Sequence, residues 1–358
     1  MWYSIEPTTP IITPSLLFYP DRIQDNIKKM IAIAGGADGL RPHVKTYKCR
    51  EVVQMQIAAG IQKFKCATLA EAQMLAEIGG LDILVAYPLV GAAQKGFLAL
   101  QAEYTDSRFS VLVDHREQLA HWQSLLDPED QLAVFIDINV GMDRTGVVPK
   151  YTLELYQQFP EQIVLKGLHI YDGHIHQTNL REREESINEA LQPLQKVLPL
   201  IQEDNDLELI YGGSISFPIH AQHPERTLSP GTTLLWDRGY QQQCPDLNFD
   251  IAALLVTRVV SKPKAGFLCL DLGYKAVAAE MKGAPVYLPQ LPTAAIVMHS
   301  EEHLVVSSVE AGKWAIGDIL YVMPWHICPT VALYDKATIV KDQQIVDEWA
   351  IPARQRYS

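Results

Sequence analysis

The strongest constraint on the fold is an alternation of short apolar segments with helix-length segments over roughly the first 235 residues. The short segments are rich in β-branched residues, which is typical of parallel strands covered by helices. The helix-like segments start at residue 21 and then occupy 48–59, 69–77, 92–101, 117–126, 151–158 and 181–202. The eight predicted strands are residues 40–44, 64–67, 83–87, 109–113, 132–138, 164–171, 207–211 and 227–228.

This count and length favour an α/β fold with a closed (β/α)₈ TIM barrel over an open doubly wound sheet. After about residue 238 the pattern changes to β-like runs separated by Gly and Pro turn signals, without helical periodicity. These runs predict a mainly antiparallel β domain, at 252–260, 266–271, 294–298, 304–307, 319–322 and 336–340. We therefore expect a barrel over residues 21–238 and a C-terminal β domain over 239–358, which residues 1–20 join as an extended segment.

Charge and cysteine content narrow the functional classes. The chain has 30 Lys and Arg against 42 Asp and Glu, a net charge of −12, with no basic block. A chain with this charge is a poor candidate for binding nucleic acid or an anionic membrane surface. The longest uncharged apolar stretch, residues 83–93, is shorter than the roughly 20 residues that span a bilayer. With no basic N-terminal region and five cysteines that form no CxxC, we expect a cytoplasmic protein.

Polar residues and glycines collect where the predicted strands end. In a barrel this rim carries the active site, so a binding or catalytic site is expected there. The sequences at these ends are Arg-Pro-His-Val-Lys-Thr-Tyr-Lys (41–48), Asp-Ile-Asn-Val-Gly-Met-Asp-Arg-Thr-Gly (137–146), His-Ile-Tyr-Asp-Gly-His-Ile-His (169–176), Gly-Gly-Ser (212–214) and Ser-Pro-Gly-Thr-Thr (229–233).

Lys45 follows a predicted apolar strand directly, so its amine would project into the barrel mouth. A lysine in such a place can have a lowered pKa and form a Schiff base, although an ordinary rim lysine remains the alternative. The Gly-Gly-Ser and Ser-Pro-Gly-Thr segments suit a phosphate group, although both also make plain turns. Their place at the last two strands is where barrel phosphate sites form. A lysine and a phosphate cradle in one mouth imply pyridoxal phosphate.

Together with the late motif Pro-Trp-His-Ile-Cys-Pro-Thr (324–330), these segments resemble the D-threonine aldolase and D-serine dehydratase family. That family belongs to the alanine-racemase-like, fold-type III pyridoxal phosphate enzymes. The resemblance covers residues 13–335 in the same order. It implies an N-terminal barrel, a following β domain and a homodimer.

The resemblance also implies roles for individual residues. Lys45 would be the catalytic lysine that binds the cofactor. Arg144 and Tyr171 would contact the pyridine ring, its O3′ or its N1. The phosphate would be bound by Gly213, Ser214, Gly231 and Thr232, and a divalent metal, zinc or manganese, by His326 and Cys328.

The His-x-Cys spacing gives independent support for the metal. On a strand, alternate residues share a face, so His326 and Cys328 would lie together, and imidazole with thiolate suits zinc. The alternative is a buried pair between strands. Two protein ligands leave positions for water or a substrate hydroxyl, as a catalytic metal requires.

Several polar residues have no assigned role at this stage. His169, His174 and His176 fit either a base or a structural histidine. Asp137, Asp143 and Asp172 fit residues that hold Arg144 or a loop in place. The stretch from His299 to His303 reads as solvated turn residues rather than metal ligands.

The expected activity is that of a lyase acting on a small β-hydroxy-D-amino acid. We favour aldolase-like cleavage to glycine and an aldehyde. The alternatives are a D-serine dehydratase-like ammonia-lyase, an amino-acid racemase of the same fold, and a non-catalytic pyridoxal phosphate carrier. The roughly 120 residues after Arg238 weigh against the carrier, because small single-barrel carriers lack a second domain.

Overall fold

The computed structural model describes residues 1–6, 9–202 and 206–356, and the chain divides into two compact units. One unit contains residues 1–28, 46–52 and 232–354. The other contains residues 29–45 and 53–231, with residues 355–356. The chain therefore passes between the units several times, once directly after Lys45 and once directly after Gly231.

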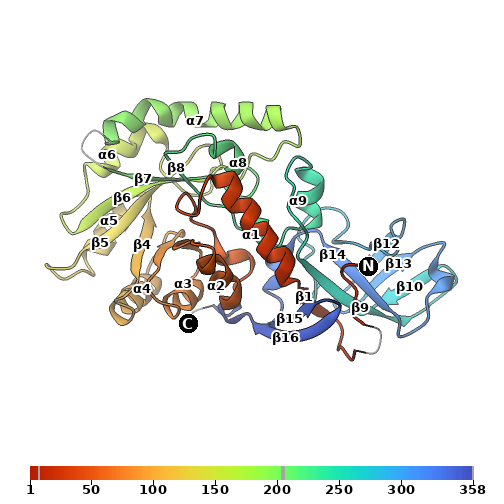
Figure 1. Cartoon of the computed structure of the whole chain (residues 1–358). Helices are drawn as coiled ribbons and strands as arrows, with labels where there is room; N and C mark the ends of the chain where they lie inside the picture. The colour runs from red at the N-terminus through yellow and green to blue at the C-terminus, as the bar shows by residue number, and fades with distance from the viewer. Residues whose placement is uncertain (7–8, 203–205, 357–358) are drawn as a thin grey trace. The chain divides into compact units, whose positions relative to one another are not determined.

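The second unit is built on a seven-stranded sheet in which every neighbouring pair is parallel (Figure 1). The strand order β2-β3-β4-β5-β6-β7-β8 follows the sequence, as right-handed βαβ units produce. Its strands are almost continuously buried, which matches their apolar sequences. They are β2 (Lys63–Cys66), β3 (Asp82–Val85), β4 (Arg108–Val113), β5 (Leu132–Ile138), β6 (Ile163–Ile170), β7 (Glu208–Tyr211) and β8 (Arg226–Leu228).

Residues 39–43 connect the two ends of this sheet. Leu40 forms a parallel bridge with Leu228 of β8, and His43 forms one with Lys65 of β2. The predicted strand over 40–44 is therefore wrong as a regular strand, since only isolated bridges form and Val44 already starts the one-turn helix η1 (Val44–Thr46). Pro42 has no N–H to donate, which interrupts the ladder, while its carbonyl still accepts a bond of 2.8 Å from Lys65 N. The ring of strands closes through this segment.

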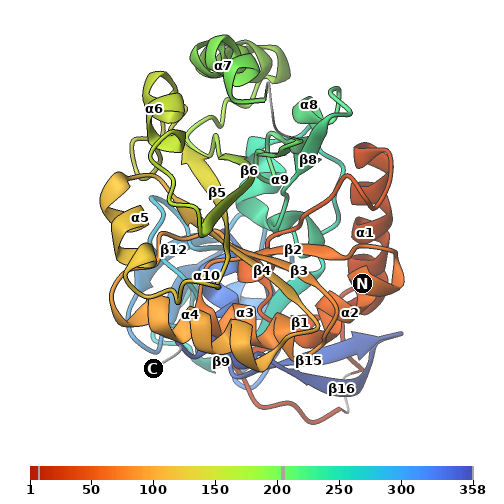
Figure 2. The ribbon, with the colours of Figure 1, turned by 90° about the vertical axis from the view of Figure 1, so that its left-hand side faces the viewer.

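Helices lie around the outside of the parallel sheet, as Figure 2 shows for α3 to α8. The turn from β2 into α3 is fixed by Thr68, whose hydroxyl accepts from the N–H of Glu71, and by the Glu71 carboxylate, which accepts from the N–H of Ala67. The helices are α1 (Pro20–Ala34), α2 (Arg50–Ala58), α3 (Leu69–Ala76), α4 (Ala92–Glu103), α5 (Arg116–Gln123), α6 (Thr152–Tyr156) with the preceding one-turn η2 (Pro149–Tyr151), α7 (Leu180–Gln202) and α8 (Phe217–His220).

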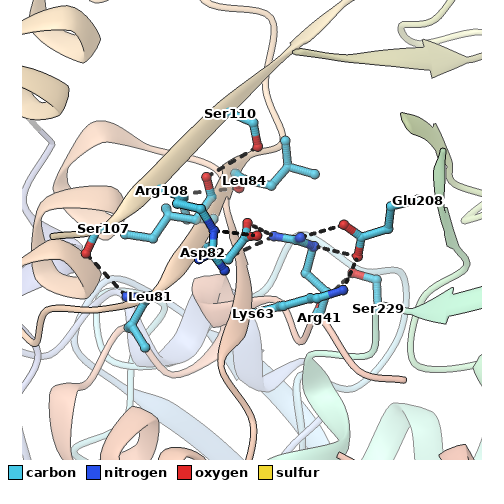
Figure 3. A network of polar contacts seen from close by, with 12 residues as sticks. Arg41, Lys63, Leu81, Asp82, Leu84, Ser107, Arg108, Ser110, Glu208 and Ser229 are labelled. Carbon is cyan, nitrogen blue, oxygen red and sulfur yellow. Dashed lines mark hydrogen bonds and ion pairs between the residues drawn. The ribbon is translucent and has the colours of Figure 1, made fainter. Parts of the chain in front are cut away.

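A buried arginine ties together the N-terminal ends of the strands (Figure 3). The fully buried Arg41 side chain lies 2.7 Å from Asp82 at the start of β3 and 2.7 Å from Glu208 at the start of β7. Lys63 at the start of β2 also pairs with Glu208, and the exposed Arg108 lies 3.5 Å from Asp82. Burial alone would raise the carboxyl pKa values of Asp82 and Glu208, but the Arg41 guanidinium holds both below their usual range.

Arg41→Met is expected to destabilise the protein by about 3 kcal/mol, because it leaves two half-buried carboxylates without their main partner. The lowered pKa values contribute stability above the unfolded value of about 4, and this contribution is lost as the pH falls. The free energy of unfolding, measured in urea at pH 7 and below pH 4, should therefore change less with pH in Arg41→Met than in wild type. The control is Arg108→Met, which removes a 78% exposed side chain and should cost less than about 1 kcal/mol. Equal losses in both variants would contradict this assignment.

The first unit contains a mainly antiparallel sheet with the strand order β12-β13-β10-β9-β1-β15-β16, and with β14 paired to both β9 and β11. The N-terminal strand β1 (Ser15–Phe18) pairs antiparallel with β9 and parallel with β15. The other strands are β9 (Ala253–Ser261), β10 (Phe267–Leu270), β11 (Val286–Tyr287), β12 (Ala295–His299), β13 (Leu304–Ser307), β14 (Ile319–Pro324), β15 (Lys336–Lys341) and β16 (Gln344–Ala350).

The predicted fold class, a parallel barrel sheet and a mainly antiparallel sheet, is confirmed. Two short helices, α9 (Arg238–Gln243) and α10 (Ile327–Val331), interrupt this β region, together with the one-turn η4 (Ala311–Lys313) and η5 (Pro352–Arg354), and the one-turn η3 (Thr232–Leu234) precedes it. These helices are too short to produce a recognisable apolar period. Among the described residues no helix is long and apolar enough to cross a membrane.

Candidate active site

A cavity of about 440 Å³ lies at the carboxyl ends of strands in the parallel sheet. This size is in the range of small-molecule sites, and this face is where barrel enzymes place their chemistry. No Asp or Glu is among the described side chains that line it. The lining residues are His43, Lys45, Lys65, Ala67, Ala86, Tyr87, Pro88, Arg144, Thr145, His169 and Tyr171.

Three of the sequence-predicted site residues meet in this cavity around one aromatic ring. Tyr171 follows directly after β6, and its half-buried ring faces the cavity. The Lys45 amine lies 5.8 Å from the centre of that ring, and the Arg144 guanidinium lies 5.3 Å from it. The structure therefore brings Lys45, Arg144 and Tyr171 together from three separate segments of the chain.

The predicted phosphate-binding glycines lie in two loops that contact each other. The N–H of Gly231, after β8, donates to Ser214 Oγ after β7 at 3.1 Å. The N–H of Gly213 donates to Ser216 Oγ at 3.1 Å. The N–H groups of both glycines are therefore bonded to serine hydroxyls here. Thr232, the next predicted residue, belongs to the other unit, where its hydroxyl lies 3.3 Å from Cys328 Sγ.

Asp172 anchors the loop after β7. Its carboxylate is buried and accepts a 2.6 Å bond from Ser216 Oγ, and it lies 2.7 Å from His220 Nε2. Burial alone would raise the pKa of Asp172, but the hydrogen bonds and charge of His220 lower it. A loop-holding role was one of the interpretations of this aspartate, and the contact with Ser216 agrees with it. Asp172, which follows β6, therefore holds the loop that carries Gly213 in place.

Two glycines make room for the Tyr171 ring. A Cβ on Gly213 would stand 2.9 Å from Tyr171 Cε2, and a Cβ on Gly173 would stand closer still to the same ring. Gly213→Val is expected to displace Tyr171 and to weaken pyridoxal phosphate binding about tenfold or more. Because the Tyr171 ring is only half-buried, the thermal stability of the cofactor-free protein should change less than the cofactor affinity.

Absorbance titration with pyridoxal phosphate and thermal unfolding of the cofactor-free protein test this prediction. Gly312→Val serves as the control, since a Cβ there meets nothing within 4 Å. Unchanged cofactor affinity in Gly213→Val would show that the loop is an ordinary turn.

A buried polar chain lies at the base of the cavity. His169 Nδ1 lies 2.7 Å from Asp137 Oδ1, and His169 Nε2 lies 3.2 Å from Lys65 Nζ. The other Asp137 oxygen accepts from Thr145 at 2.7 Å. Burial would raise the pKa of Asp137, but its bonds to His169 and Thr145 lower it. Burial and the charge of Lys65 lower the pKa of His169.

Lys65 is a cavity residue that was not predicted from the sequence. The available signal was the alternation in Lys-Phe-Lys-Cys (63–66), which places Lys63 and Lys65 on one face of a strand. The sequence does not show which face turns inward, so an inward-facing lysine was not predicted.

His326 and Cys328 interact, but the predicted strand that was to carry them is wrong. Strand β14 ends at Pro324, His326 precedes helix α10, and Cys328 is the second residue of that helix. Burial disfavours the charged imidazole, yet its hydrogen bond to Cys328 raises the pKa of His326 to about 9. Burial also opposes ionisation of the Cys328 thiol, but His326 lowers its pKa.

Other groups surround this pair within the same unit. Glu280 contacts His326 Nδ1, and the hydroxyl of Thr46 lies 3.2 Å from Cys328 Sγ. Asp237 accepts the N–H of Ile327 at 3.0 Å and so holds the start of the helix. Over residues 1–6, 9–202 and 206–356, no three His, Cys, Asp or Glu side chains gather in an arrangement that could hold a metal ion.

The remaining candidate residues lie apart from these groups or make structural contacts. Nδ1 of His174 is buried without a hydrogen-bond partner in the described structure, while His176 is exposed. In the stretch from His299 to His303, Glu301 and Glu302 pair with Lys275 at 2.7 and 3.0 Å on an exposed turn. Asp143 accepts a bond from Asn139 at 3.0 Å within its own loop.

Known proteins share both the sequence and the fold. The family model of the alanine racemase N-terminal domain matches residues 19–226, and that of a putative serine dehydratase domain matches residues 252–340. The chain is 30% identical to a D-threonine aldolase from Arthrobacter sp. over 98% of this chain and 94% of that protein. It is 24% identical to a D-serine dehydratase from Dictyostelium discoideum over 94% of this chain and 95% of that one.

The crystal structure of a D-threonine aldolase from Filomicrobium marinum superposes with a TM-score of 0.87 at 23% identity, covering 96% of this chain and 95% of that one. The fold is thus that of the alanine-racemase-like proteins. Within that class, the chain belongs to the D-threonine aldolase and D-serine dehydratase family.

Proposed function

We propose that the protein is a pyridoxal phosphate- and metal-dependent lyase that acts on β-hydroxy-D-amino acids. The leading reaction is D-threonine aldolase-like cleavage to glycine and an aldehyde. The observation that carries this proposal is the meeting of Lys45, Arg144 and Tyr171 in a cavity whose described lining contains no carboxylate. Family membership and the names of the relatives agree with it.

The cavity residues fit pyridoxal phosphate. An amine is available to bind its carbonyl at Lys45, and the surplus of positive side chains suits its phosphate and ring oxygen. Because Gly213 and Gly173 have no Cβ, the Tyr171 ring fits against both of them and lines the cavity, where a flat ligand could lie against it. We assign ring contacts to Arg144 and Tyr171, and phosphate contacts to Gly213, Ser214, Gly231 and Thr232.

When bound, pyridoxal phosphate supplies an electron sink for the substrate α-carbon. The chain supplies the remaining functions. Lys45 is the residue that would hold the cofactor carbonyl through its amine, and when free the same amine would be available in the cavity to accept a proton from the substrate. Arg144 neutralises negative charge on the ring oxygen or the substrate carboxylate. The contact between Asp137 and His169 fixes the imidazole in position at the base of the cavity.

We assign the divalent metal, zinc or manganese, to His326 and Cys328. Imidazole and thiolate form a donor set that zinc prefers, and Glu280 on Nδ1 leaves Nε2 as the ring nitrogen able to bind metal. A metal held there by two side chains retains positions for water or substrate and supplies Lewis-acid polarisation of a hydroxyl.

Dehydration is the second candidate reaction, because the model of a putative serine dehydratase domain matches residues 252–340. That reaction removes the α-proton, expels the hydroxyl, and gives an α-keto acid and ammonia. A racemase needs a second base and no metal, and a carrier needs no turnover. We further propose that the protein acts as a cytoplasmic homodimer.

Product analysis separates these possibilities. Purified protein is loaded with pyridoxal phosphate and incubated with D-threonine, D-serine or 3-hydroxy-D-aspartate, with and without EDTA. Glycine with an aldehyde supports the aldolase, ammonia with an α-keto acid supports the dehydratase, and inversion without cleavage supports a racemase. Absence of any turnover with all three substrates would contradict the proposal.

A further inference from the structure

Lys65 is a buried lysine in the cavity that the proposed chemistry does not use. The residue is 3% exposed, and it lies on β2, where it lines the cavity. The Lys65 amine lies 5.8 Å from the centre of the Tyr171 ring, the same distance as the Lys45 amine. With Arg144, three basic side chains therefore flank one ring. Such a surplus of positive charge is unfavourable in an empty cavity and favourable when an anion is bound.

The hydrogen-bond partner of Lys65 is His169, which can accept a bond from either charge state of the lysine amine. Because the Asp137 carboxylate accepts the proton on His169 Nδ1, the Nε2 atom of the neutral imidazole is an acceptor. Lys65 donates to that Nε2 at 3.2 Å. A neutral amine can make this bond and keep its lone pair, so the side chain stays fixed in both charge states.

The charged groups around Lys65 shift its pKa in opposite directions. Burial has the largest effect, and the positive charges of Lys45 and Arg41 act with it to lower the pKa of Lys65 to about 7. The carboxylates of Asp137 and Asp172 oppose this effect. An added anion in the cavity would act in the same direction as the two carboxylates and raise the pKa.

We propose that Lys65 is an anion-binding side chain that is a neutral amine in the empty cavity and an ammonium when pyridoxal phosphate is bound. This inference rests on the proposed function, because it takes the cavity as the cofactor site. In the step, the Lys65 nitrogen gains one proton from solvent as the anion enters, and no covalent bond to Lys65 forms. Arg144 and His43 line the same cavity and add to its preference for an anion.

Calorimetric titration with pyridoxine 5′-phosphate tests the proposal. This ligand has the ring hydroxyl and the phosphate but no aldehyde, so its binding involves no covalent bond to Lys45. Heats measured at pH 8 in two buffers of different ionisation enthalpy give the number of protons taken up. Wild type should take up more protons per site than Lys65→Met, with a difference of at most one. Lys166→Met, which removes an exposed lysine of β6, should match wild type.

Lys65→Arg provides a second comparison, because arginine stays charged and should bind the ligand without the additional uptake. Should either variant fail to fold, NMR of wild type with labelled lysine amines gives the same information. The Lys65 signal should titrate near pH 7 without ligand and at a higher pH with it.

Equal proton uptake in wild type and Lys65→Met, or a Lys65 amine that stays protonated at pH 8 without ligand, would overturn the inference alone. No binding of pyridoxine 5′-phosphate to wild type would overturn both the inference and the proposed cofactor site.

Discussion

Lys45→Ala is expected to lower lyase turnover on the order of 10³-fold or more, because it removes the amine that is proposed to bind the cofactor carbonyl and to accept the α-proton. Pyridoxal phosphate should still bind, though more weakly, since Arg144 and Tyr171 remain in the cavity. Turnover of D-threonine and D-serine, measured at saturating pyridoxal phosphate, checks this prediction.

Lys48→Ala is the matched control for that substitution. Lys48 lies in the same sequence motif, but it belongs to the unit that contains residues 46–52 and 232–354, and its amine contacts the carbonyl of Ala353 in that same unit at 3.4 Å. Its loss should leave turnover within about twofold of wild type, as expected for a residue outside the catalytic machinery. If Lys48→Ala loses turnover and Lys45→Ala keeps it, the two lysines have been assigned in the wrong order.

Removal of the metal ligands should separate cofactor binding from lyase activity. Treatment with EDTA, His326→Ala and Cys328→Ala should each lower turnover about 10²-fold or more, because each removes the polarisation of the substrate hydroxyl. The visible absorbance of bound pyridoxal phosphate should remain, since its attachment depends on Lys45. Slow exchange of the α-proton should survive, because the cofactor ring alone acidifies that position.

Cys269→Ala provides the control for thiol loss, since Cys269 is a free cysteine on β10. It should retain full activity and full metal content by elemental analysis. Full lyase turnover in metal-free wild-type protein would remove the metal from the reaction and favour the racemase alternative.

Much of the barrel is predictable because its strands are continuous apolar runs. Strand β5 has the predicted bounds, residues 132–138, and the ends of the other strands of that sheet lie within two residues of their predicted positions. The segment around Pro42 was harder to predict, because its apolar residues indicate a strand while the missing proline N–H interrupts the ladder. Strand β16 was missed, since Gln344–Ala350 mixes acidic and apolar residues and is mostly exposed.

The position of the candidate site was predictable from polar residues at the strand ends, but its contacts were not. Gly213 was expected to approach a phosphate, whereas the structure shows that its missing side chain makes room for Tyr171. Cys328 was placed on a strand, because the four residues between Pro324 and Pro329 carry no period that distinguishes strand from helix. Lys65 was missed because burial of a strand lysine depends on which face turns inward.

Borohydride reduction followed by peptide mapping is the most direct test of the proposed cofactor site. Protein loaded with pyridoxal phosphate is reduced, digested and analysed by mass spectrometry for the attached pyridoxyl group. The account predicts one modified peptide, which carries the group on Lys45, and no modification in Lys45→Ala. Attachment to Lys48 or Lys65, or a reducible adduct that persists in Lys45→Ala, would contradict it.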